Sequence, residues 1–182
     1  MNWKTLSSNY LFRDNWLTIR SDTCERPDGT IIDPYYVYEF PDFVAAVALT
    51  KEKKVIMVRQ YRHALGKTIL EIPGGCVDAS DESHAKAIER ELLEETGYQF
   101  EQIEFLCDTS PNPSTNNNLM HVFLATGGEK VAEQKLDEGE DIEVLFFSID
   151  EIKELIRSNQ LLQSMHTTAF LYALEKLGEL KY

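Results

Sequence analysis

Three acidic residues lie close together in the segment Arg90–Gly97, which reads Arg-Glu-Leu-Leu-Glu-Glu-Thr-Gly. If the segment is helical, Glu91 and Glu95 lie one turn apart on the same side, and Glu94 lies within about 100° of both. Carboxylates at these spacings repel one another unless a cation neutralises them. Because hard oxygen ligands favour Mg²⁺ or Mn²⁺, the pattern predicts a divalent-metal site.

The turn before this segment supports the same chemistry. It reads Pro73-Gly-Gly-Cys-Val-Asp78, and its glycines allow backbone carbonyls to approach a metal or ligand closely. Glu82 precedes Arg90 by eight positions, so we expect this pair to brace the loop through a charged hydrogen bond. An acidic helix face that is simply solvated is the alternative. The loop, the brace and the acidic cluster in one segment favour the metal site.

Regular elements are expected on both sides of this segment. The helix that carries the acidic cluster is expected to begin at Ser80 or Asp81 as N-cap and to end at Gly97. Asp150 is expected to cap a short helix, and a final helix is expected over residues 160–178. The pattern predicts strands over residues 43–50, 55–61, 68–72, 119–126 and 142–149. This order predicts an α/β (α+β) fold with a mixed sheet that helices cover on both faces.

The N-terminal part predicts a small β section. Strands are expected over residues 15–22 and 31–40, joined by the turn Arg26-Pro-Asp-Gly29. We therefore expect an N-terminal antiparallel β section over residues 1–42 and the main domain over residues 43–182.

Charge and cysteine content narrow the class of protein. The chain has 31 acidic and 18 basic residues, a net charge of −13, which argues against nucleic acid as a partner. The odd set Cys24, Cys76 and Cys107 suggests neither a disulfide framework nor a zinc site, so a reducing cytoplasm is the simpler interpretation. The sequence shows no signal peptide and no apolar run of the roughly 20 residues that span a membrane.

The acidic segment resembles a known family motif. Gly75, Glu82 and then Arg90-Glu-Leu-x-Glu-Glu-x-Gly97 resemble the Nudix box of the Nudix hydrolases. Six residues, 76–81, separate Gly75 from Glu82, one more than in the usual box. Either the loop has an extra residue or Cys76 occupies the glycine position. The resemblance implies a Nudix-type α-β-α sandwich.

The resemblance also implies roles for the acidic cluster. Glu91 and Glu95 are implied to be the main metal ligands, Glu94 an additional ligand, and Gly74 the donor of a main-chain carbonyl. The implied cofactor is Mg²⁺, which lowers the pKa of a water molecule and offsets charge on the phosphoryl oxygens.

A second stretch resembles the ADP-ribose pyrophosphatase branch of this family. It consists of Val58-Arg-Gln-Tyr-Arg62 followed by Glu71-Ile-Pro-Gly-Gly75. The resemblance implies that Arg62 contacts the substrate phosphates. Arg59 lies three positions earlier, on the opposite strand face, so at most one of the two points into a common site. Glu71 is expected to face away from buried Leu70 and Ile72, either toward the site or toward solvent.

The N-terminal section resembles the same branch, in which this part commonly exchanges between the subunits of a homodimer. Trp16 matches an aromatic residue that stacks on adenine, and a core or dimer-interface tryptophan is an equal alternative. Pro34 stands where the second aromatic residue of the usual clamp is expected. Tyr35 and Tyr36 are the candidate substitutes.

The segment Asp137-Glu-Gly-Glu-Asp141 resembles the mobile acidic loop that supplies a base or an extra metal ligand in this branch. Glu140 aligns best and Glu138 is the second choice. A solvated acidic turn is the alternative. The four histidines, His63, His84, His121 and His166, show no ligand spacing, so each is expected to be a surface or hydrogen-bonded residue.

The resemblance implies metal-dependent hydrolysis of ADP-ribose or a related nucleoside diphosphate sugar to a nucleoside monophosphate and a sugar phosphate. The rival within the family is an enzyme for dinucleoside polyphosphates or modified nucleotides. The rival of another class is a nucleotide-sensing Nudix domain that binds without hydrolysis.

Overall fold

The computed structural model describes residues 1–14 and 17–180. The described residues fall into two compact units: Met1–Asp42 with Ser110–Leu119, and the described part of Phe43–Thr109 with Met120–Tyr182. The first unit thus includes residues 110–119, which the expected division into 1–42 and 43–182 assigns to the main domain. Within the described residues, no helix is both long enough and apolar enough to cross a bilayer.

The described part of the first unit contains an antiparallel sheet in the order β1 (Lys4–Arg13), β2 (Thr18–Glu25), β3 (Ile31–Glu39). The tight turn predicted between the last two strands is present, because the Gly29 amide donates to the Arg26 carbonyl at 2.9 Å. Gly29 has φ +81°, a left-handed conformation that favours glycine. β1 was not expected, since its sequence lacks a regular apolar alternation.

Among the described residues of the second unit, eight strands form one mixed sheet. Its main path runs β11 (Glu143–Phe147), β5 (Val55–Arg62), β4 (Phe43–Thr50), β10 (Met120–Lys130), β8 (Tyr98–Gln99). Three further strands pair with this path: β6 (Lys67–Glu71) with β5, β7 (Gly74–Cys76) with β4, and β9 (Gln102–Thr109) with β10. The β4–β10 pair is parallel and the other pairs are antiparallel, so the predicted mixed sheet is confirmed.

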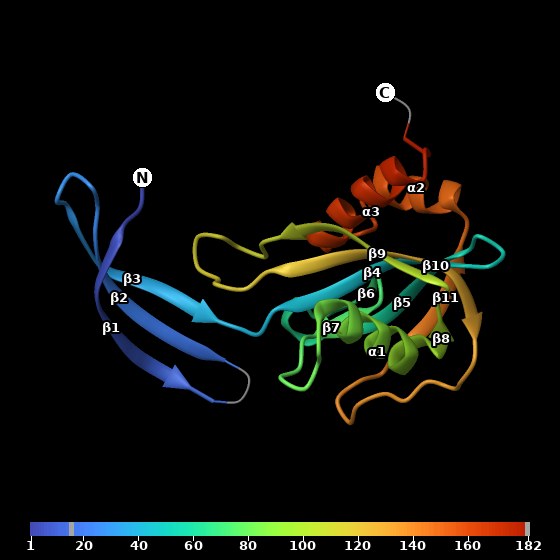
Figure 1. Ribbon diagram of the computed structural model, residues 1–182, viewed down its shortest axis with the longest axis horizontal. Coiled ribbons are helices and arrows are strands. Elements are labelled where there is room, and N and C mark those ends of the chain that lie inside the picture. The colour runs from blue at the N-terminus through green and yellow to red at the C-terminus, as the bar shows by residue number, and fades with distance from the viewer. Residues whose placement is uncertain (15–16, 181–182) are drawn as a thin grey trace. The chain divides into compact units, whose positions relative to one another are not determined.

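The sheet is buried on both faces, which explains the continuous apolar sequence of β4. Val44, Ala46 and Ala48 face a core completed by α1 (His84–Thr96). Ala45, Val47 and Leu49 face a second core, completed by α2 (Ile149–Arg157) and α3 (Ser164–Lys176). Figure 1 shows α1 on one side of the sheet and α2 and α3 on the other. The predicted α-β-α sandwich is confirmed.

Helix boundaries differ from the expected ones at several ends. The N-cap of α1 is Ser83, whose hydroxyl accepts a hydrogen bond from the Lys86 amide at 3.2 Å, so Ser80 and Asp81 were wrong. The end at Gly97 is confirmed, with φ +75°. Ser148, and not Asp150, caps α2 and forms a capping box with Glu151. α3 begins at Ser164, later than the predicted residue 160.

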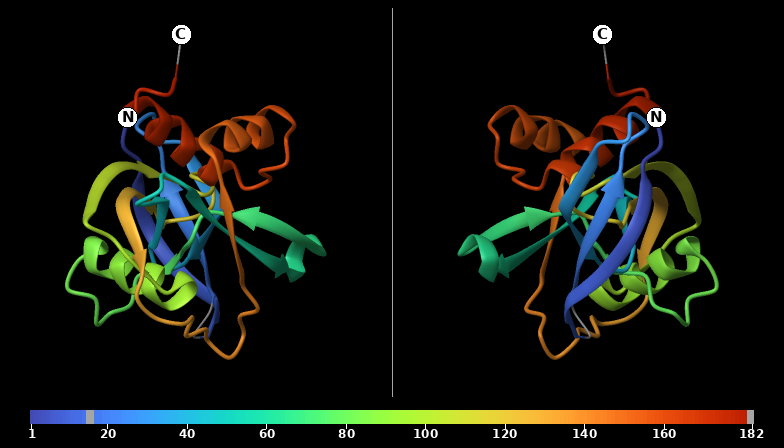
Figure 2. Two further views of the ribbon diagram at one scale, coloured as in Figure 1. Left: turned by 90° about the vertical axis from the view of Figure 1, so that its right-hand side faces the viewer. Right: turned by 90° about the vertical axis from the view of Figure 1, so that its left-hand side faces the viewer.

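The β5–β6 hairpin carries the stretch that resembles the ADP-ribose branch. Its turn is the 3₁₀ helix η1 (His63–Leu65), which ends at Gly66 with φ +62°. In Figure 2 the outer ends of β5 and β6 extend beyond the neighbouring strands of the sheet. Arg62, the last residue of β5, therefore lies on an extension of the sheet near the turn.

Candidate active site

The acidic cluster lies at the edge of the face that α1 packs on the sheet. Ile88 and Leu92 are fully buried in the core between α1 and the sheet. Each contributes about 2 kcal/mol to folding by this burial. Because Glu91 and Glu95 lie next to these residues on the helix surface, Glu95 is only 3% exposed and the Glu91 side chain only 12% exposed. The apolar packing of α1 thus sets the burial of its two candidate metal ligands.

Two glycines let the chain approach these carboxylates. The Gly74 amide donates a hydrogen bond to Glu95 Oε2 at 2.8 Å. Gly74 has φ +151°, and a Cβ there would lie 2.1 Å from the Val44 carbonyl oxygen. A Cβ on Gly75 would lie 2.6 Å from the carboxyl carbon of Glu91. Gly74 therefore has no room for a side chain, whereas a side chain at position 75 would displace the Glu91 carboxylate.

The electrostatics of the cluster fit a cation. Burial, together with the neighbouring charges of Glu91 and Glu140, raises the pKa of Glu95 to about 8, although the Gly74 hydrogen bond opposes the shift. Burial likewise raises the pKa of Glu91 to about 7, although Arg90 opposes the shift. Carboxylates in this state lack sufficient positive charge nearby. A divalent cation bound by their oxygens would supply it.

Arg90 organises the outer side of the cluster. Its Nη1 donates to Glu91 Oε1 at 2.9 Å and to Glu94 Oε2 at 3.0 Å. Its Nη2 donates to the Cys76 carbonyl at 3.1 Å. One guanidinium thus joins two carboxylates of α1 to the loop that precedes the helix.

The carboxylate that braces Arg90 from the loop is Asp81, and the expected brace by Glu82 is wrong. Asp81 accepts two hydrogen bonds from Arg90, at 3.1 Å from Nε and 2.9 Å from Nη2. This pairing raises the pKa of Arg90 and lowers that of Asp81. The spacing of the sequence could have indicated Asp81 as the brace. Five residues, 76–80, separate it from Gly75, which is the usual spacing between the glycine and the acidic residue of the box. Glu82 is exposed.

The predicted acidic loop is attached to the end of α1. The Gln134 side chain donates to the carbonyl of Glu95 at 2.6 Å and to that of Ile142 at 3.1 Å. The Lys135 amide donates to the Glu94 carbonyl at 2.8 Å. These bonds satisfy carbonyls that the end of a helix leaves without intrahelical partners. Gln134 was missed from the sequence because a single glutamine in a loop carries no recognisable spacing.

The structure distinguishes the two glutamates of this loop. The charge of Glu140 contributes to the raised pKa values of both Glu91 and Glu95. Its carboxylate also accepts a hydrogen bond from the Asp137 amide at 3.1 Å. Glu138 is exposed. Glu140 is therefore the loop glutamate that interacts electrostatically with the acidic cluster.

The hairpin residues form two ion pairs. Arg62 Nε donates to Glu71 Oε2 at 2.8 Å, and the Glu71 side chain is buried. Leu70 packs against the same core as Ile72, as expected, whereas the buried Glu71 carboxylate excludes the solvent-facing alternative for this residue. Arg59 Nε donates to Glu143 Oε2 at 2.7 Å, across the β5–β11 pair.

The aromatic candidates lie in the N-terminal unit. Trp16 lies outside the described residues. The Tyr35 hydroxyl donates to the Ser114 carbonyl at 2.8 Å, and the Tyr35 ring meets Trp3 edge to face with centroids 6.0 Å apart. Tyr36 is exposed. Tyr35 is thus engaged in contacts within its own unit.

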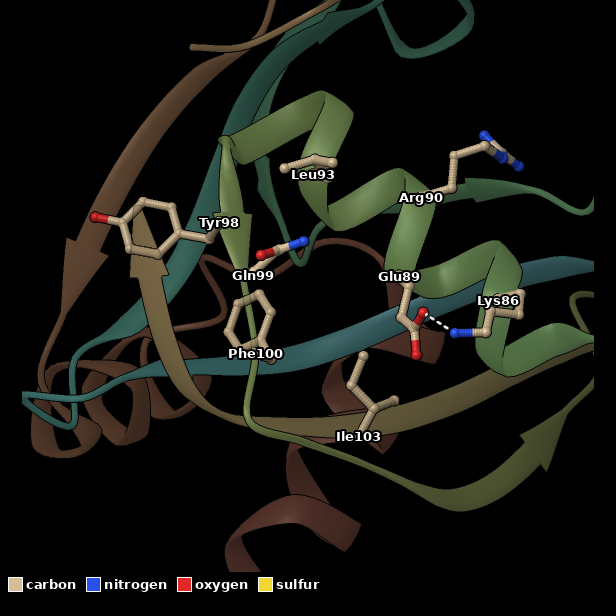
Figure 3. Close-up of a pocket in the computed structure, with 8 residues that line it drawn as sticks. All are labelled: Lys86, Glu89, Arg90, Leu93, Tyr98, Gln99, Phe100 and Ile103. Carbon is tan, nitrogen blue, oxygen red and sulfur yellow. Dashed lines mark hydrogen bonds and ion pairs between the residues drawn. The ribbon is translucent and has the colours of Figure 1, made fainter. Parts of the chain in front are cut away.

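A separate hollow of about 520 Å³ lies beside α1. Figure 3 shows its apolar side chains, which include Leu93, Phe100 and Ile103, next to the ion pair of Lys86 and Glu89. Of the described residues that line it, none is a glutamate of the acidic cluster. The hollow therefore adjoins the candidate metal site at Arg90, which lines it, but contains none of the candidate metal ligands.

Known proteins resemble this chain in sequence and in fold. A family model described as the NUDIX domain matches residues 40–165, and one described as the nucleoside diphosphate sugar hydrolase N-terminal domain matches residues 3–38. The methanol dehydrogenase activator of Bacillus methanolicus is 32% identical over 170 residues, covering 93% of this chain and 91% of its own. The ADP-ribose pyrophosphatase of Bacillus subtilis strain 168 is 31% identical over 170 residues, with the same coverage.

The fold likeness extends over the whole length of a solved structure. The crystal structure of an ADP compounds hydrolase matches with a TM-score of 0.83 and 20% identity, covering 99% of this chain and 98% of that chain. At this identity the likeness shows the fold alone. The family match and the relatives confirm the family that the acidic segment predicts: the chain belongs to the NUDIX family.

Proposed function

We propose that this NUDIX protein hydrolyses the diphosphate bond of ADP-ribose or a related nucleoside diphosphate sugar, releasing a nucleoside monophosphate and a sugar phosphate. The observation that carries the proposal is the buried pair Glu91 and Glu95 against the Gly74–Gly75 turn. The N-terminal family model and the relative described as an ADP-ribose pyrophosphatase support the substrate class.

The proposed cofactor is Mg²⁺, with Mn²⁺ as the alternative. NUDIX hydrolases generally need a divalent metal. Glu91, Glu94, Glu95 and the Gly74 carbonyl would hold the ion, and the raised pKa values of Glu91 and Glu95 support this assignment. A bound ion would supply positive charge to the phosphoryl oxygens and lower the pKa of water.

The proposed base is Glu140, with Glu138 as the second candidate. Its role is to accept the proton of the attacking water, which requires a carboxylate near the acidic cluster. The electrostatic effect of Glu140 on Glu91 and Glu95 supports the first choice. The hydrogen bonds of Gln134 and Lys135 to the end of α1 would hold the start of this loop while its tip closes.

The proposed phosphate contact comes from the β5–β6 hairpin. Arg62 would bind the phosphates, because its Nε bond to Glu71 leaves further guanidinium donors in a fixed orientation. Glu71 then acts through Arg62. Arg59 is the weaker candidate, since both its Nε and its Nη2 are engaged by Glu143. Trp16 remains the residue proposed to stack on the adenine ring of the substrate.

A substrate panel tests the proposed function. Purified protein with Mg²⁺ is assayed on ADP-ribose, other nucleoside diphosphate sugars, dinucleoside polyphosphates and modified nucleoside triphosphates, with product identification. Release of AMP and a sugar phosphate from ADP-ribose, or of the corresponding products from another nucleotide sugar, supports the proposal. Turnover confined to dinucleoside polyphosphates or triphosphates would refute the substrate class. Tight binding of ADP-ribose without turnover would instead identify a sensing domain.

We propose a homodimer formed through the N-terminal unit. The described part of this unit exposes large apolar side chains: Trp3, Leu6, Tyr10, Leu11, Phe12 and Ile31. A second copy of this chain would cover part of them, since exposed apolar side chains favour association. Light scattering on the purified protein tests this, and a monomer at micromolar concentration would refute it.

We propose that the protein works in the cytoplasm, without nucleic-acid partners. The free thiols of Cys24, Cys76 and Cys107 and the net charge of −13 support this environment. Fractionation of cells that express the protein tests the location.

A further inference from the structure

Two histidines that are far apart in the sequence lie face to face. The rings of His84 and His121 have centroids 3.6 Å apart and planes inclined by only 15°. His84 is the first residue of α1, and His121 is the second residue of β10. Both belong to the second compact unit. The fold therefore creates an imidazole pair that the spacing of the histidines in the sequence does not reveal.

Asp108 orients one of these rings. Asp108 on β9 is the cross-strand partner of His121 on β10, and its Oδ1 lies 2.7 Å from His121 Nδ1. A carboxylate at Nδ1 favours the tautomer with the proton on that nitrogen, which makes Nε2 the coordinating atom. Histidines that bind metals commonly have a carboxylate in this position. The arrangement is thus that of a metal ligand with its supporting acid.

We infer that His84 and His121 form a binding site for a divalent transition-metal ion such as Zn²⁺, with Asp108 orienting His121. A ligand nitrogen of His84 lies within 4.8 Å of one of His121. Because the two ring planes are nearly parallel, an ion that binds both nitrogens requires the exposed His84 ring to turn out of the stack. Water completes the coordination of an ion held by two imidazoles.

The donor atoms separate this site from the acidic cluster. Imidazole nitrogens favour Zn²⁺, Ni²⁺ and Cu²⁺, whereas the oxygens of Glu91 and Glu95 favour Mg²⁺ and Mn²⁺. Glu91 lies seven positions after His84, which corresponds to a rise of about 10 Å along α1. A zinc ion at His84 therefore does not replace the ion expected at the acidic cluster.

The site joins the start of α1 to β10. In the unfolded chain the two imidazoles are separated, so an ion that binds both stabilises the native state. At a free zinc concentration of about 100 Kd, we expect the Tm to rise by about 5 °C. His84→Ala should abolish this rise.

Calorimetric titration with Zn²⁺ tests the inference. The full chain is titrated in excess Mg²⁺, which occupies the carboxylate oxygens. Wild type is compared with His84→Ala and with His63→Ala, a control at an exposed histidine in η1. We expect wild type and His63→Ala to bind one more zinc ion than His84→Ala. Equal zinc stoichiometry, affinity and Tm rise in wild type and His84→Ala would overturn the inference.

Electron paramagnetic resonance with Cu²⁺ reports the donor atoms directly. Under the same conditions, wild type should show nitrogen coupling from two imidazoles, and His84→Ala from one. Asp108→Asn should weaken zinc binding by about 10-fold without changing its stoichiometry. A wild-type spectrum without nitrogen coupling would exclude the histidine site.

Discussion

The Gly74 backbone amide donates a hydrogen bond to Oε2 of Glu95 at 2.8 Å. Glu95 is buried beside Leu92, so this bond fixes one carboxylate oxygen and leaves the other available for a cation. The backbone of the turn thus positions a side chain of the acidic cluster. Because the bond needs only an acceptor, the charge and the position of residue 95 can be separated experimentally.

Glu95→Gln removes the charge while keeping an oxygen that accepts from Gly74. We expect kcat with the best nucleotide sugar to fall by about 100-fold or more, since several kcal/mol of metal-dependent stabilisation is lost. The fold should be unchanged by circular dichroism. Glu89→Gln is the matched control, because Glu89 lies on the same helix but pairs with Lys86 at the surface. Near-normal turnover of Glu95→Gln would remove Glu95 from the metal site.

Gly75→Ala should separate activity from stability. The new Cβ would lie 2.6 Å from the carboxyl carbon of Glu91, which is the flexible end of that side chain. The carboxylate therefore moves at little cost to folding, but it leaves the position at which it would bind metal. We expect activity to fall by about 10-fold or more while the Tm changes by only a few degrees. Activity equal to wild type at all Mg²⁺ concentrations would show that the position of Glu91 is unimportant.

Asp81→Asn tests the brace on Arg90. Loss of the charge weakens two hydrogen bonds to the guanidinium, which in turn contacts Glu91 and Glu94. We expect the Mg²⁺ concentration for half-maximal activity to rise by about 10-fold. Glu82→Gln, one residue later, should behave as wild type. The reverse order of effects would restore Glu82 as the brace.

The sequence predicted the elements that have strong local patterns. The apolar run of β4, the periodic α1 and the stop at Gly97 were all recognisable, because burial and the left-handed C-cap act within a few residues. The segment from residue 80 to 83 was ambiguous, since Ser80, Asp81 and Ser83 are all good caps. The tertiary bond of Asp81 to Arg90 occupies that carboxylate, and Ser83 caps the helix.

Contacts between distant parts of the chain explain the remaining differences. β1 pairs along its length with β2, so its formation depends on a partner strand more than on its own alternation. Gln134 and the pair His84 and His121 depend in the same way on where α1 meets later segments. In the acidic segment, by contrast, the residues that carry the chemistry are neighbours in sequence, and its family was recognised for that reason.

Glu140→Gln and Glu138→Gln distinguish the two candidate bases. If Glu140 accepts the proton, Glu140→Gln should lower kcat by about 100-fold, within the usual range for a general base. Glu138→Gln should change kcat by less than about three-fold, since Glu140, and not Glu138, is among the charges that raise the pKa values of Glu91 and Glu95. The measurement is kcat against pH at saturating Mg²⁺. A larger loss in Glu138→Gln would reverse the assignment.

His166 should make the protein sensitive to acid. It lies buried on α3, where its Nδ1 accepts a hydrogen bond from the Ile72 amide at 3.4 Å. Burial, aided by the positive charge of Arg62, lowers the pKa of His166 from 6.5 to about 3. The unfolded chain therefore binds a proton below pH 6.5 that the folded chain does not bind until about pH 3. The stability that the neutral ring contributes is complete above pH 6.5 and is lost as the pH falls toward 3.

We expect the free energy of unfolding to decrease by about 2 kcal/mol, because of His166, as the pH falls from 6.5 to 5. His166→Asn keeps an acceptor for the Ile72 amide but cannot take the proton. The measurement is urea unfolding of both proteins at pH 7, 6, 5.5 and 5. Other acidic groups titrate equally in both proteins, so the difference between the two slopes isolates His166. Parallel stability curves over this range would show that the ring is accessible to protons in the folded state.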